Sequence, residues 1–265
     1  MHRSLSATAL AFALAACGGG GTDEEAFEPQ AAVVAPAVTP GSVPSAPGAD
    51  QVVFSGHTFQ VRSGAGGPGP NTWSTQNVWV DGNGWLHLKI SQQAGQWTAA
   101  EVYTTEALGF GTYQFKIAGH PEALDDNVVL GLFNYPTPDV GPDGTNEIDI
   151  EFATWGGAQP QHGNWTVWPA TAATPLATHP WNPLSTTGAS THQFTWSAKS
   201  VAFQSLDGKR KVASWNYAPR NAAAVVPQQA MPLHMNFWLF QGQAPTDAQE
   251  AEIVVTQFTF TARRR

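Results

Sequence analysis

The chain has one cysteine, few charged residues and no long amphipathic pattern, and each shortage excludes a class of protein. Among its 265 residues the single cysteine, Cys17, excludes a disulfide-stapled domain. Charged residues make up 12% of the chain, about half of the ~25% of an average soluble domain. No window of helical length after the N-terminal segment repeats apolar residues with helical spacing, which argues against helical bundles and coiled coils. The 26 glycines and 20 prolines interrupt the chain too often for long helices.

Positive charge is also scarce. The chain has 12 Lys and Arg residues against 20 Asp and Glu residues, a formal net charge of −8. Surfaces that bind nucleic acid or anionic membranes need a basic patch, so this balance argues against both partners. A neutral, hydrated substrate fits better. The alternative is that the mild acidity only keeps a secreted protein soluble.

The N-terminus is patterned like a secretion signal. Arg3 precedes an apolar run over residues 5–16, which is too short to span a bilayer as a helix. The run leads into Leu-Ala-Ala-Cys, which resembles the lipobox of bacterial lipoproteins. The resemblance implies a signal peptide over residues 1–16, a lipid on Cys17 and a place in the bacterial cell envelope. Because Gly18 follows the cysteine, the outer membrane is favoured. An ordinary signal peptide with a chance cysteine is the alternative.

Residues 17–50 are expected to form a tether between the lipid and a folded domain. Gly, Pro and Ala prevail in this segment, and it has no apolar periodicity. The folded part then spans residues 51–265, which we interpret as one domain because all-β sandwiches of this length are commonly single domains. We expect a monomer that meets the membrane only through the lipid on Cys17.

From residue 51 onward, short β-patterned segments alternate with turn signals. Residues 85–90 alternate apolar and polar side chains after the turn Asp-Gly-Asn-Gly, and a second hairpin surrounds Asp207-Gly208. Residues 128–133 form a continuous apolar run, which is typical of a strand covered on both faces. About a dozen such segments without helices predict an all-β fold, a two-sheet antiparallel β-sandwich of the jelly-roll type.

The most informative segment is residues 146–152, Asn-Glu-Ile-Asp-Ile-Glu-Phe. Successive side chains of a strand point to opposite faces, so the apolar residues enter the core while Glu147, Asp149 and Glu151 share the other face. Like charges side by side on a β face are destabilising, so a strand selected only for stability would not keep three of them. We interpret them as catalytic. A site for a hard cation and a solvated surface are the alternatives.

Paired carboxyl groups of this kind suit glycoside hydrolysis. Residues i and i+4 of a strand lie about 13 Å apart at Cα. If the long side chains of Glu147 and Glu151 lean inward, their carboxyl groups approach the ~5–5.5 Å separation of retaining glycosidases. One carboxylate then attacks the sugar and the other group protonates the leaving oxygen. Glu151 as the acid needs a raised pKa, which anionic neighbours provide. Asp149 lies between the two and can modulate both.

The Glu-Ile-Asp-Ile-Glu segment resembles the signature strand of family 16 glycoside hydrolases, the laminarinase and lichenase group. Residues 100–113, 192–209 and 235–238 are similar, in family order, to further segments of these enzymes. The resemblance implies a concanavalin A-like jelly roll. It also implies roles for the three acids, with Glu147 as the nucleophile, Asp149 as the assisting acid and Glu151 as the general acid/base.

The same resemblance implies that Glu101, Asn236 and Trp238 contact sugar. Tyr135 and Trp155 lie close in sequence to the signature strand, and aromatic rings stack on the flat C–H faces of sugars, so we add both as substrate-binding candidates.

Three features depart from the family pattern. Tyr103 stands where lichenases commonly have Arg, which argues against lichenan specificity. Gln257 stands where many members have a calcium-ligating Asp, so we expect no structural calcium, and no cofactor or metal site elsewhere. Residues 168–190 form an insertion without a recognisable counterpart and are a candidate cleft loop.

The sequence therefore predicts a retaining endo-glycosidase that hydrolyses a β-linked polysaccharide by double displacement. A β-1,3-glucan or a mixed-linkage β-1,3-1,4-glucan is the first expectation for the substrate. A galactanase or a transglycosylase of the same fold remains open. A polysaccharide-binding jelly roll without turnover is the alternative from another class of protein.

Overall fold

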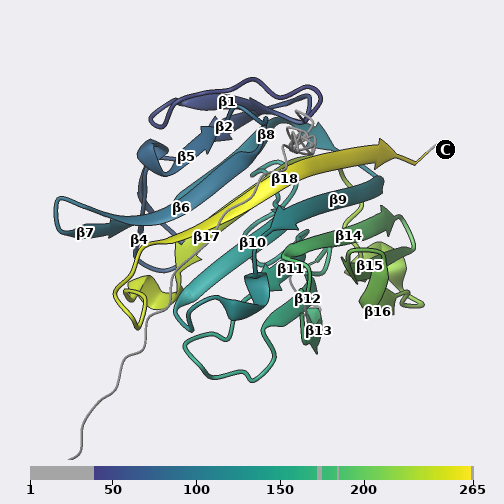
Figure 1. The fold of residues 1–265 in the computed structure, drawn as a ribbon. Coiled ribbons are helices and arrows are strands. Elements are labelled where there is room, and N and C mark those ends of the chain that lie inside the picture. Colours follow the sequence, from purple (N-terminus) through teal and green to yellow (C-terminus); the bar gives the residue numbers. More distant parts are fainter. Residues whose placement is uncertain (1–38, 172–174, 184, 264–265) are drawn as a thin grey trace, which may run out of the picture. The chain divides into compact units, whose positions relative to one another are not determined.

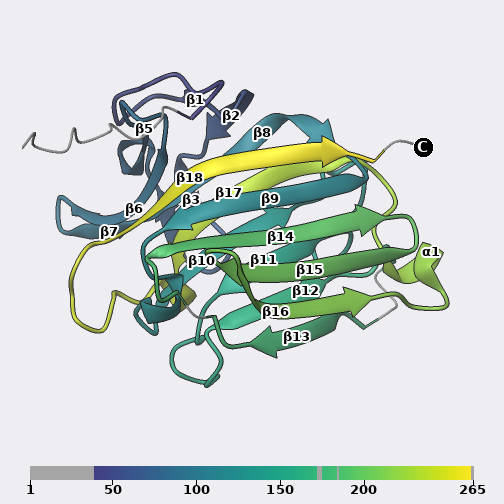
Figure 2. The ribbon, with the colours of Figure 1, turned by 45° about the vertical axis from the view of Figure 1, so that its right-hand side comes forward.

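A computed structural model describes residues 39–171, 175–183 and 185–263. These residues form two antiparallel β-sheets that stack face to face (Figures 1 and 2). The predicted all-β, two-sheet sandwich is therefore confirmed. Among the described residues no helix is long and apolar enough to cross a membrane.

The first sheet carries the signature strand near its middle. Its eight strands follow the order β1 (Gln51–Phe54), β2 (His57–Val61), β8 (Ala100–Leu108), β17 (Met231–Leu239), β10 (Val128–Asn134), β11 (Ile148–Phe152), β12 (Gly163–Val167) and β13 (Ala177–Trp181). Strands that are far apart in sequence, such as β8 and β17, are therefore neighbours in space.

The second sheet covers one face of the first. Its order is β16 (Arg210–Tyr217), β15 (Ser200–Asp207), β14 (Ala189–Ser197), β9 (Gly111–Ala118), β18 (Ala251–Ala262), β6 (Leu86–Gln93) and β5 (Val78–Val80), with β7 (Gln96–Thr98) paired to β6. A small hairpin and four short helical turns complete the fold, namely β3 (Gly64–Gly66), β4 (Asn71–Trp73), η1 (Thr75–Asn77), η2 (Pro121–Ala123), α1 (Ala222–Val225) and η3 (Phe240–Gly242).

The core between the sheets follows the alternation of the strands. On β11, Ile148, Ile150 and Phe152 are fully buried in the apolar cluster that joins the two sheets. All seven residues of β10 are buried, as the continuous apolar run at residues 128–133 predicts. Because alternate residues of β11 are fixed in the core, its acidic residues must point away from it.

The start of the domain differs from the prediction. The signal peptide (residues 1–16), Cys17 and the predicted tether up to residue 38 lie outside the described residues. Residues 39–50, which the sequence assigns to the tether, instead pack on the sandwich. The buried Thr39 donates its hydroxyl hydrogen to the Thr256 carbonyl at 2.7 Å, and Val43 forms a β-bridge with Val53. These contacts use backbone groups and small side chains, so no apolar periodicity reveals them.

His192 on β14 is a buried neutral base in the core. Its ring is 2% exposed, and its two nitrogens lie 2.8 Å from the hydroxyls of Ser205 and Ser190. Its edge contacts Phe152 of the other sheet, with the ring centroids 4.8 Å apart. Burial disfavours the charged form and lowers the pKa of His192 to about 3.

This depressed pKa predicts how stability changes with acidity. The unfolded histidine binds a proton below about pH 6.5 and the folded one does not, so stability present above that pH is lost as the pH falls towards 3. We expect His192→Gln to be less stable than the parent at pH 7. Between pH 7 and pH 4.5, however, its free energy of unfolding should fall by about 2–3 kcal/mol less than that of the parent.

Urea unfolding at both pH values measures this difference. His120→Gln, at a half-exposed side chain on the surface, is the matched control and should follow the parent. Identical pH dependence in His192→Gln and the parent would contradict the assignment of His192 as a buried neutral base.

Candidate active site

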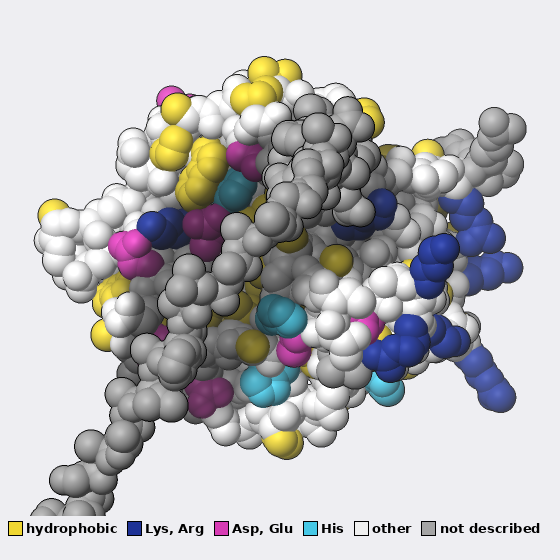
Figure 3. Space-filling view, viewed as in Figure 1, with side chains coloured by type: hydrophobic (Ala, Val, Ile, Leu, Met, Phe, Trp, Pro, Cys, Tyr) yellow, Lys and Arg dark blue, Asp and Glu magenta, His cyan; other side chains and the backbone are white. Residues whose placement is uncertain are grey.

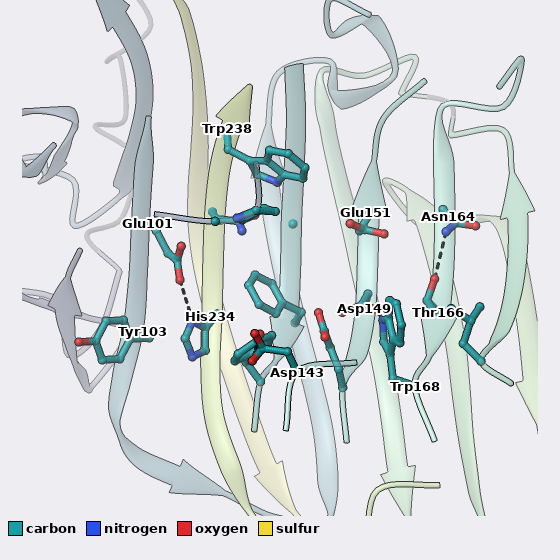
Figure 4. A pocket seen from close by; sticks show the side chains of 18 of the residues that line it. Glu101, Tyr103, Asp143, Asp149, Glu151, Asn164, Thr166, Trp168, His234 and Trp238 are labelled. Atoms are coloured by element: carbon teal, nitrogen blue, oxygen red, sulfur yellow. Dashed lines mark hydrogen bonds and ion pairs between the residues drawn. The ribbon is translucent and has the colours of Figure 1, made fainter. Parts of the chain in front are cut away.

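The face of the first sheet that points away from the core contains a groove of about 890 Å³. The described side chains along it come mainly from β8, β10, β11, β12 and β17 (Figure 4). The groove is lined by Arg62, Glu101, Tyr103, Gly131, Phe133, Tyr135, Asp143, Glu147, Asp149, Glu151, Trp155, Asn164, Thr166, Trp168, Leu176, Thr178, His234, Asn236 and Trp238, together with Gly67 and Pro68. All eight predicted catalytic and substrate-binding residues are in this set.

Strand register arranges the polar side chains in rows across the sheet. In the first row, Glu151 on β11 lies opposite Gly131 on β10 and Asn164 on β12. Gly131 lies opposite Asn236 on β17, and Asn236 lies opposite Glu101 on β8. Residues directly opposite each other in a sheet share a face, so this row crosses five strands on the groove side.

A second row of side chains is offset from the first by two residues along each strand. Asp149 lies opposite Phe133 on β10 and Thr166 on β12, and Phe133 lies opposite His234 on β17. His234 is paired with Tyr103 on β8, and their rings stack with the centroids 5.1 Å apart. The second row therefore places an aromatic and imidazole surface beside the acids.

Glu147 is positioned by the turn that leads into β11. Asn146 has a φ of 53°, a left-handed conformation that Asn tolerates better than most residues, and its backbone N–H bonds to the Pro169 carbonyl at 2.9 Å. The Glu147 carbonyl accepts a hydrogen bond from the Trp168 backbone N–H at 2.9 Å. The Trp168 indole N–H in turn donates to Asp149 Oδ2 at 2.9 Å. The turn and Trp168, which directly follows β12, thus hold Glu147 and Asp149 in place together.

The three acids interact as a group. Burial, together with the charges of Glu147 and Glu151, raises the pKa of Asp149 well above its usual value. Asp149 is 3% exposed, and its side-chain hydrogen bond with Glu147 adds to the upward shift of its pKa. The three positions therefore carry fewer than three negative charges at neutral pH, which reduces the repulsion that the sequence alone implies.

The two glutamates differ in their electrostatic surroundings. Burial raises the pKa of Glu147 to about 7, with a further upward contribution from the charge of Asp143, while the hydrogen bond from Asp149 opposes the rise. Burial and the charge of Glu147 raise the pKa of Glu151 to about 8, although Asn164 opposes this shift. Both glutamates therefore keep a proton to a higher pH than an exposed carboxyl group does. Two such groups can share the roles of carboxylate and carboxylic acid that acid-assisted nucleophilic substitution requires.

The five predicted substrate-binding residues take different positions in the groove. Glu101 is 3% exposed and accepts hydrogen bonds from Arg62 Nη1 at 2.7 Å and His234 Nδ1 at 2.9 Å. Trp155 and Trp238 form an aromatic pair with centroids 6.4 Å apart. The Tyr135 hydroxyl donates to Asp143 Oδ1 at 2.8 Å, and burial raises the pKa of Tyr135. Asn236 is 4% exposed and lies on β17 opposite Glu101.

Several groove residues had no predicted role, among them Arg62, Asp143, Asn164 and His234. His234 lies two residues before Asn236 on one strand, so strand alternation places both on one face. The spacing of two residues could therefore have assigned His234 to the groove. No feature of the sequence assigns Asn164 in this way, because its place beside Glu151 depends on how β12 pairs with β11.

The insertion at residues 168–190 contributes to one side of the groove. It contains β13, which pairs with β12 at the edge of the first sheet. Leu176 and Thr178 from this segment line the groove. Within the described ranges, no group of three or more His, Cys, Asp and Glu side chains has a geometry that could hold a metal ion.

The chain is similar to one known protein family and to many solved structures. The sequence pattern of the family described as "Glycosyl hydrolases family 16" matches residues 70–257. No curated protein matches the chain. Solved structures share the fold at low sequence identity.

Three of these structures illustrate the likeness. The β-glucanase of Bacillus licheniformis is 18% identical, with a TM-score of 0.57 over 85% of this chain and 100% of that one. A family 16 protein of Bacteroides ovatus in complex with a mixed-linkage glucan product is 12% identical, with a TM-score of 0.60 over 77% and 94%. An antigen of Mycobacterium tuberculosis, described as a pseudo β-1,3-glucanase, is 19% identical, with a TM-score of 0.59 over 83% and 94%.

The raised pKa of Glu151 predicts that this site reduces stability at alkaline pH. A carboxyl group whose folded pKa is about 8 contributes stability below the unfolded value, and that stability is lost as the pH rises through 8. We expect Glu151→Gln to raise the melting temperature by about 3–8 °C at pH 8.5 and to leave it nearly unchanged at pH 4.5.

Differential scanning calorimetry at the two pH values measures the shift. Glu106→Gln, at an exposed side chain on β8, is the matched control and should change little. An equal or lower melting temperature of Glu151→Gln at pH 8.5 would contradict the electrostatic description of the groove.

Proposed function

Because the chain belongs to glycosyl hydrolase family 16, we propose that it is a retaining endo-glycosidase. Its substrate is a neutral β-linked glucan, which it cleaves by double displacement. The observation that carries the proposal is the pair of glutamates, Glu147 and Glu151, which line the groove together with Asp149 and have pKa values raised by burial. In a retaining enzyme the lower-pKa group is the nucleophile and the higher-pKa group is the acid.

The proposed reaction has two steps. In the first, the Glu147 carboxylate attacks the anomeric carbon while Glu151 gives its proton to the departing glycosidic oxygen, which leaves a glycosyl ester on Glu147. In the second, the ionised Glu151 takes a proton from water, the water oxygen attacks the anomeric carbon, and Glu147 is released as a carboxylate. Protonated Asp149 hydrogen-bonds to Glu147 and so stabilises its charge before attack and after release.

The charge of the groove supports an uncharged substrate. Five carboxyl groups line it, those of Glu101, Asp143, Glu147, Asp149 and Glu151. Among the described lining residues Arg62 is the one Lys or Arg side chain, and it is already paired with Glu101. Many of the other cationic side chains gather at the side of the molecule where β18 ends (right in Figure 3). Sulfated galactans and uronic acid polymers would be repelled by the groove, which favours a glucan among the substrates of this fold.

The linkage proposed is β-1,3 or mixed β-1,3-1,4. A β-glucanase and a protein bound to a mixed-linkage glucan product share the fold over most of this chain. Tyr103 lies on the groove and stacks on His234. Because lichenases commonly have Arg at the Tyr103 position, we rank β-1,3-glucan first.

We also propose that the protein is a lipoprotein of the bacterial outer membrane. The support is the Leu-Ala-Ala-Cys sequence that ends at Cys17, since a lipidated cysteine would anchor the domain to a membrane surface.

We expect Glu147→Gln to lower kcat on soluble β-1,3-glucan by about a thousandfold or more, because it removes the attacking carboxylate while keeping the side-chain shape. Release of reducing ends from purified residues 39–265 measures the loss, and Glu106→Gln is the matched control. A loss of only a few-fold would remove Glu147 from the mechanism. Binding without cleavage by the unmodified chain would favour a carbohydrate-binding protein.

The stereochemical outcome gives a separate expectation. Proton NMR of the first products should show the β-anomer, because two inversions at one carbon amount to retention. First-formed α-anomer would contradict double displacement.

Membrane attachment is expected to depend on Cys17. In the full chain, Cys17→Ser should release the protein from isolated membranes, and globomycin should block processing of the precursor to its mature mass. Unchanged fractionation and mass would refute the lipid anchor.

A further inference from the structure

Trp155, in the connection between β11 and β12, has a backbone conformation that tryptophan rarely adopts. Its φ is 55°, and Gly156 and Gly157 follow with φ values of 71° and 77°. In this left-handed region the Cβ atom of an L-residue crowds the following carbonyl oxygen, so glycine is favoured over bulky residues. Such a conformation persists only where the surrounding structure holds it, and residues of this kind gather at functional sites.

The surrounding structure that holds Trp155 is centred on Asp126, in the segment just before β10. The Asp126 carbonyl accepts a hydrogen bond from the Gly156 backbone N–H at 2.8 Å. Its Oδ1 atom accepts one from the hydroxyl of Thr154, a buried residue, at 2.7 Å. A Cβ atom at Gly157 would lie 3.2 Å from Asp126 Oδ2, so the carboxylate also lies close to the turn. Asp126 therefore fixes the residues on both sides of Trp155.

The ring of Trp155 packs on a small apolar cluster on the groove side of the first sheet. Trp73, Val129 and Trp238 are buried in this cluster, which is separate from the core between the sheets. The centroid of the Trp155 ring lies 6.4 Å from that of Trp238 and 5.7 Å from that of Phe240. Trp155 and Trp238 both line the groove, and we call this pair the aromatic wall.

The residue after Asp126 anchors a second loop that contacts the aromatic wall. The Asn127 carbonyl accepts a hydrogen bond from the Phe240 backbone N–H at 2.8 Å, and Asn127 Nδ2 donates to the Ala244 carbonyl at 2.8 Å. Two neighbouring residues thus hold the two loops whose rings, Trp155 and Phe240, meet edge to face.

The aromatic wall lies beside the proposed acid. Trp238 is opposite Val129 on β10, and Gly131, two residues further along β10, is opposite Glu151. Figure 4 shows Trp238 on the side of Glu151 away from Asp149 (top of the view). Trp155 is half-buried and lines the groove, so part of its ring is open to a ligand.

We propose that Asp126 is a positioning residue, which holds the turn at residues 154–157 so that the Trp155 ring stacks on a sugar ring bound beside Glu151. The inference rests on the proposed function and gives a role in substrate binding to a residue that is not among the described groove-lining residues. Without the Asp126 carboxylate, the Thr154 hydroxyl loses its acceptor and the turn relaxes. The Trp155 ring then leaves the position in which its face meets the flat C–H face of a sugar.

The test is a double-mutant cycle measured by binding. Glu147→Gln, which blocks cleavage, serves as the host, and isothermal titration calorimetry with β-1,3-gluco-oligosaccharides gives the dissociation constants. Trp155→Gly removes the ring but suits the left-handed turn, and it should weaken binding by about tenfold. Asp126→Ala should weaken it by about threefold to tenfold. The double variant should bind within about twofold of Trp155→Gly alone, because Asp126 acts through that ring.

The conservative variant separates positioning from the charge of the carboxylate. Asp126→Asn keeps an oxygen that accepts from Thr154, so it should bind within about twofold of the host. Asp247→Ala is the matched control, since Asp247 is exposed and its Oδ1 accepts only a local hydrogen bond among those described, from the Gln249 backbone N–H. If Asp126→Ala does not fold, Thr154→Val removes the same hydrogen bond and takes its place in the cycle.

A spectroscopic measurement follows the Trp155 ring without any sugar. In protein labelled with 5-fluorotryptophan, the fluorine NMR signal that is missing from Trp155→Phe belongs to Trp155. Asp126→Ala should shift or broaden this signal, whereas Asp126→Asn and Asp247→Ala should leave it in place. Addition of the oligosaccharide to the host should also shift it.

Binding by folded Asp126→Ala within twofold of the host, an unchanged Trp155 signal in that variant, or losses that multiply in the double variant would each overturn the inference. Binding by Asp126→Asn as weak as that of Asp126→Ala would overturn it as well. Turnover by the unmodified chain tests the proposed hydrolase separately, because the cycle uses a host that cannot cleave.

Discussion

The site depends on three carboxyl groups that share one face of β11. Their proximity is imposed by the opposite face, where Ile148, Ile150 and Phe152 are locked into the core between the sheets. A rotation of the strand that moved the acids apart would expose these apolar side chains to water. The repulsion between the carboxylates is reduced instead by raised pKa values, which favour protonated carboxyl groups. Burial and the neighbouring charges raise the pKa of Asp149 well above its usual value, and burial raises those of Glu147 and Glu151 to about 7 and about 8. Acid–base chemistry near neutral pH follows from this crowding.

The remainder of the groove is organised by strand pairing. One row runs from Glu101 through Asn236 and Gly131 to Glu151 and Asn164, on five strands that come from distant parts of the sequence. The rigid sheet fixes the spacing of these groups, while the turn at Asn146 and the segment that contains β13 shape the sides of the groove. The unpaired, buried Oδ1 atom of Asn236 and the like-charged acids both reduce stability.

Much of this arrangement could be predicted from local patterns. Alternation in residues 146–152 assigns the acids to one face, and the family resemblance adds Glu101, Asn236 and Trp238, which all line the groove. Residues whose place depends on non-local register could not be found in this way. The position of Gly131 between Asn236 and Glu151 requires the pairing of β10 with both β17 and β11. The early start of the domain was missed for a related reason, since residues 39–50 attach through backbone bonds without an apolar pattern.

The central claim is that Glu147 forms a covalent bond to the sugar while Glu151 supplies and recovers the proton. A 2-deoxy-2-fluoro-β-gluco-oligosaccharyl fluoride tests it most directly, because the fluorine slows hydrolysis of the ester and allows it to accumulate. Peptide mass spectrometry of the inactivated protein should find the added glycosyl mass on the peptide with Glu147, attached to that carboxyl group. A label on Glu151 or Asp149, or turnover of a glucan without any covalent adduct under these conditions, would contradict the account.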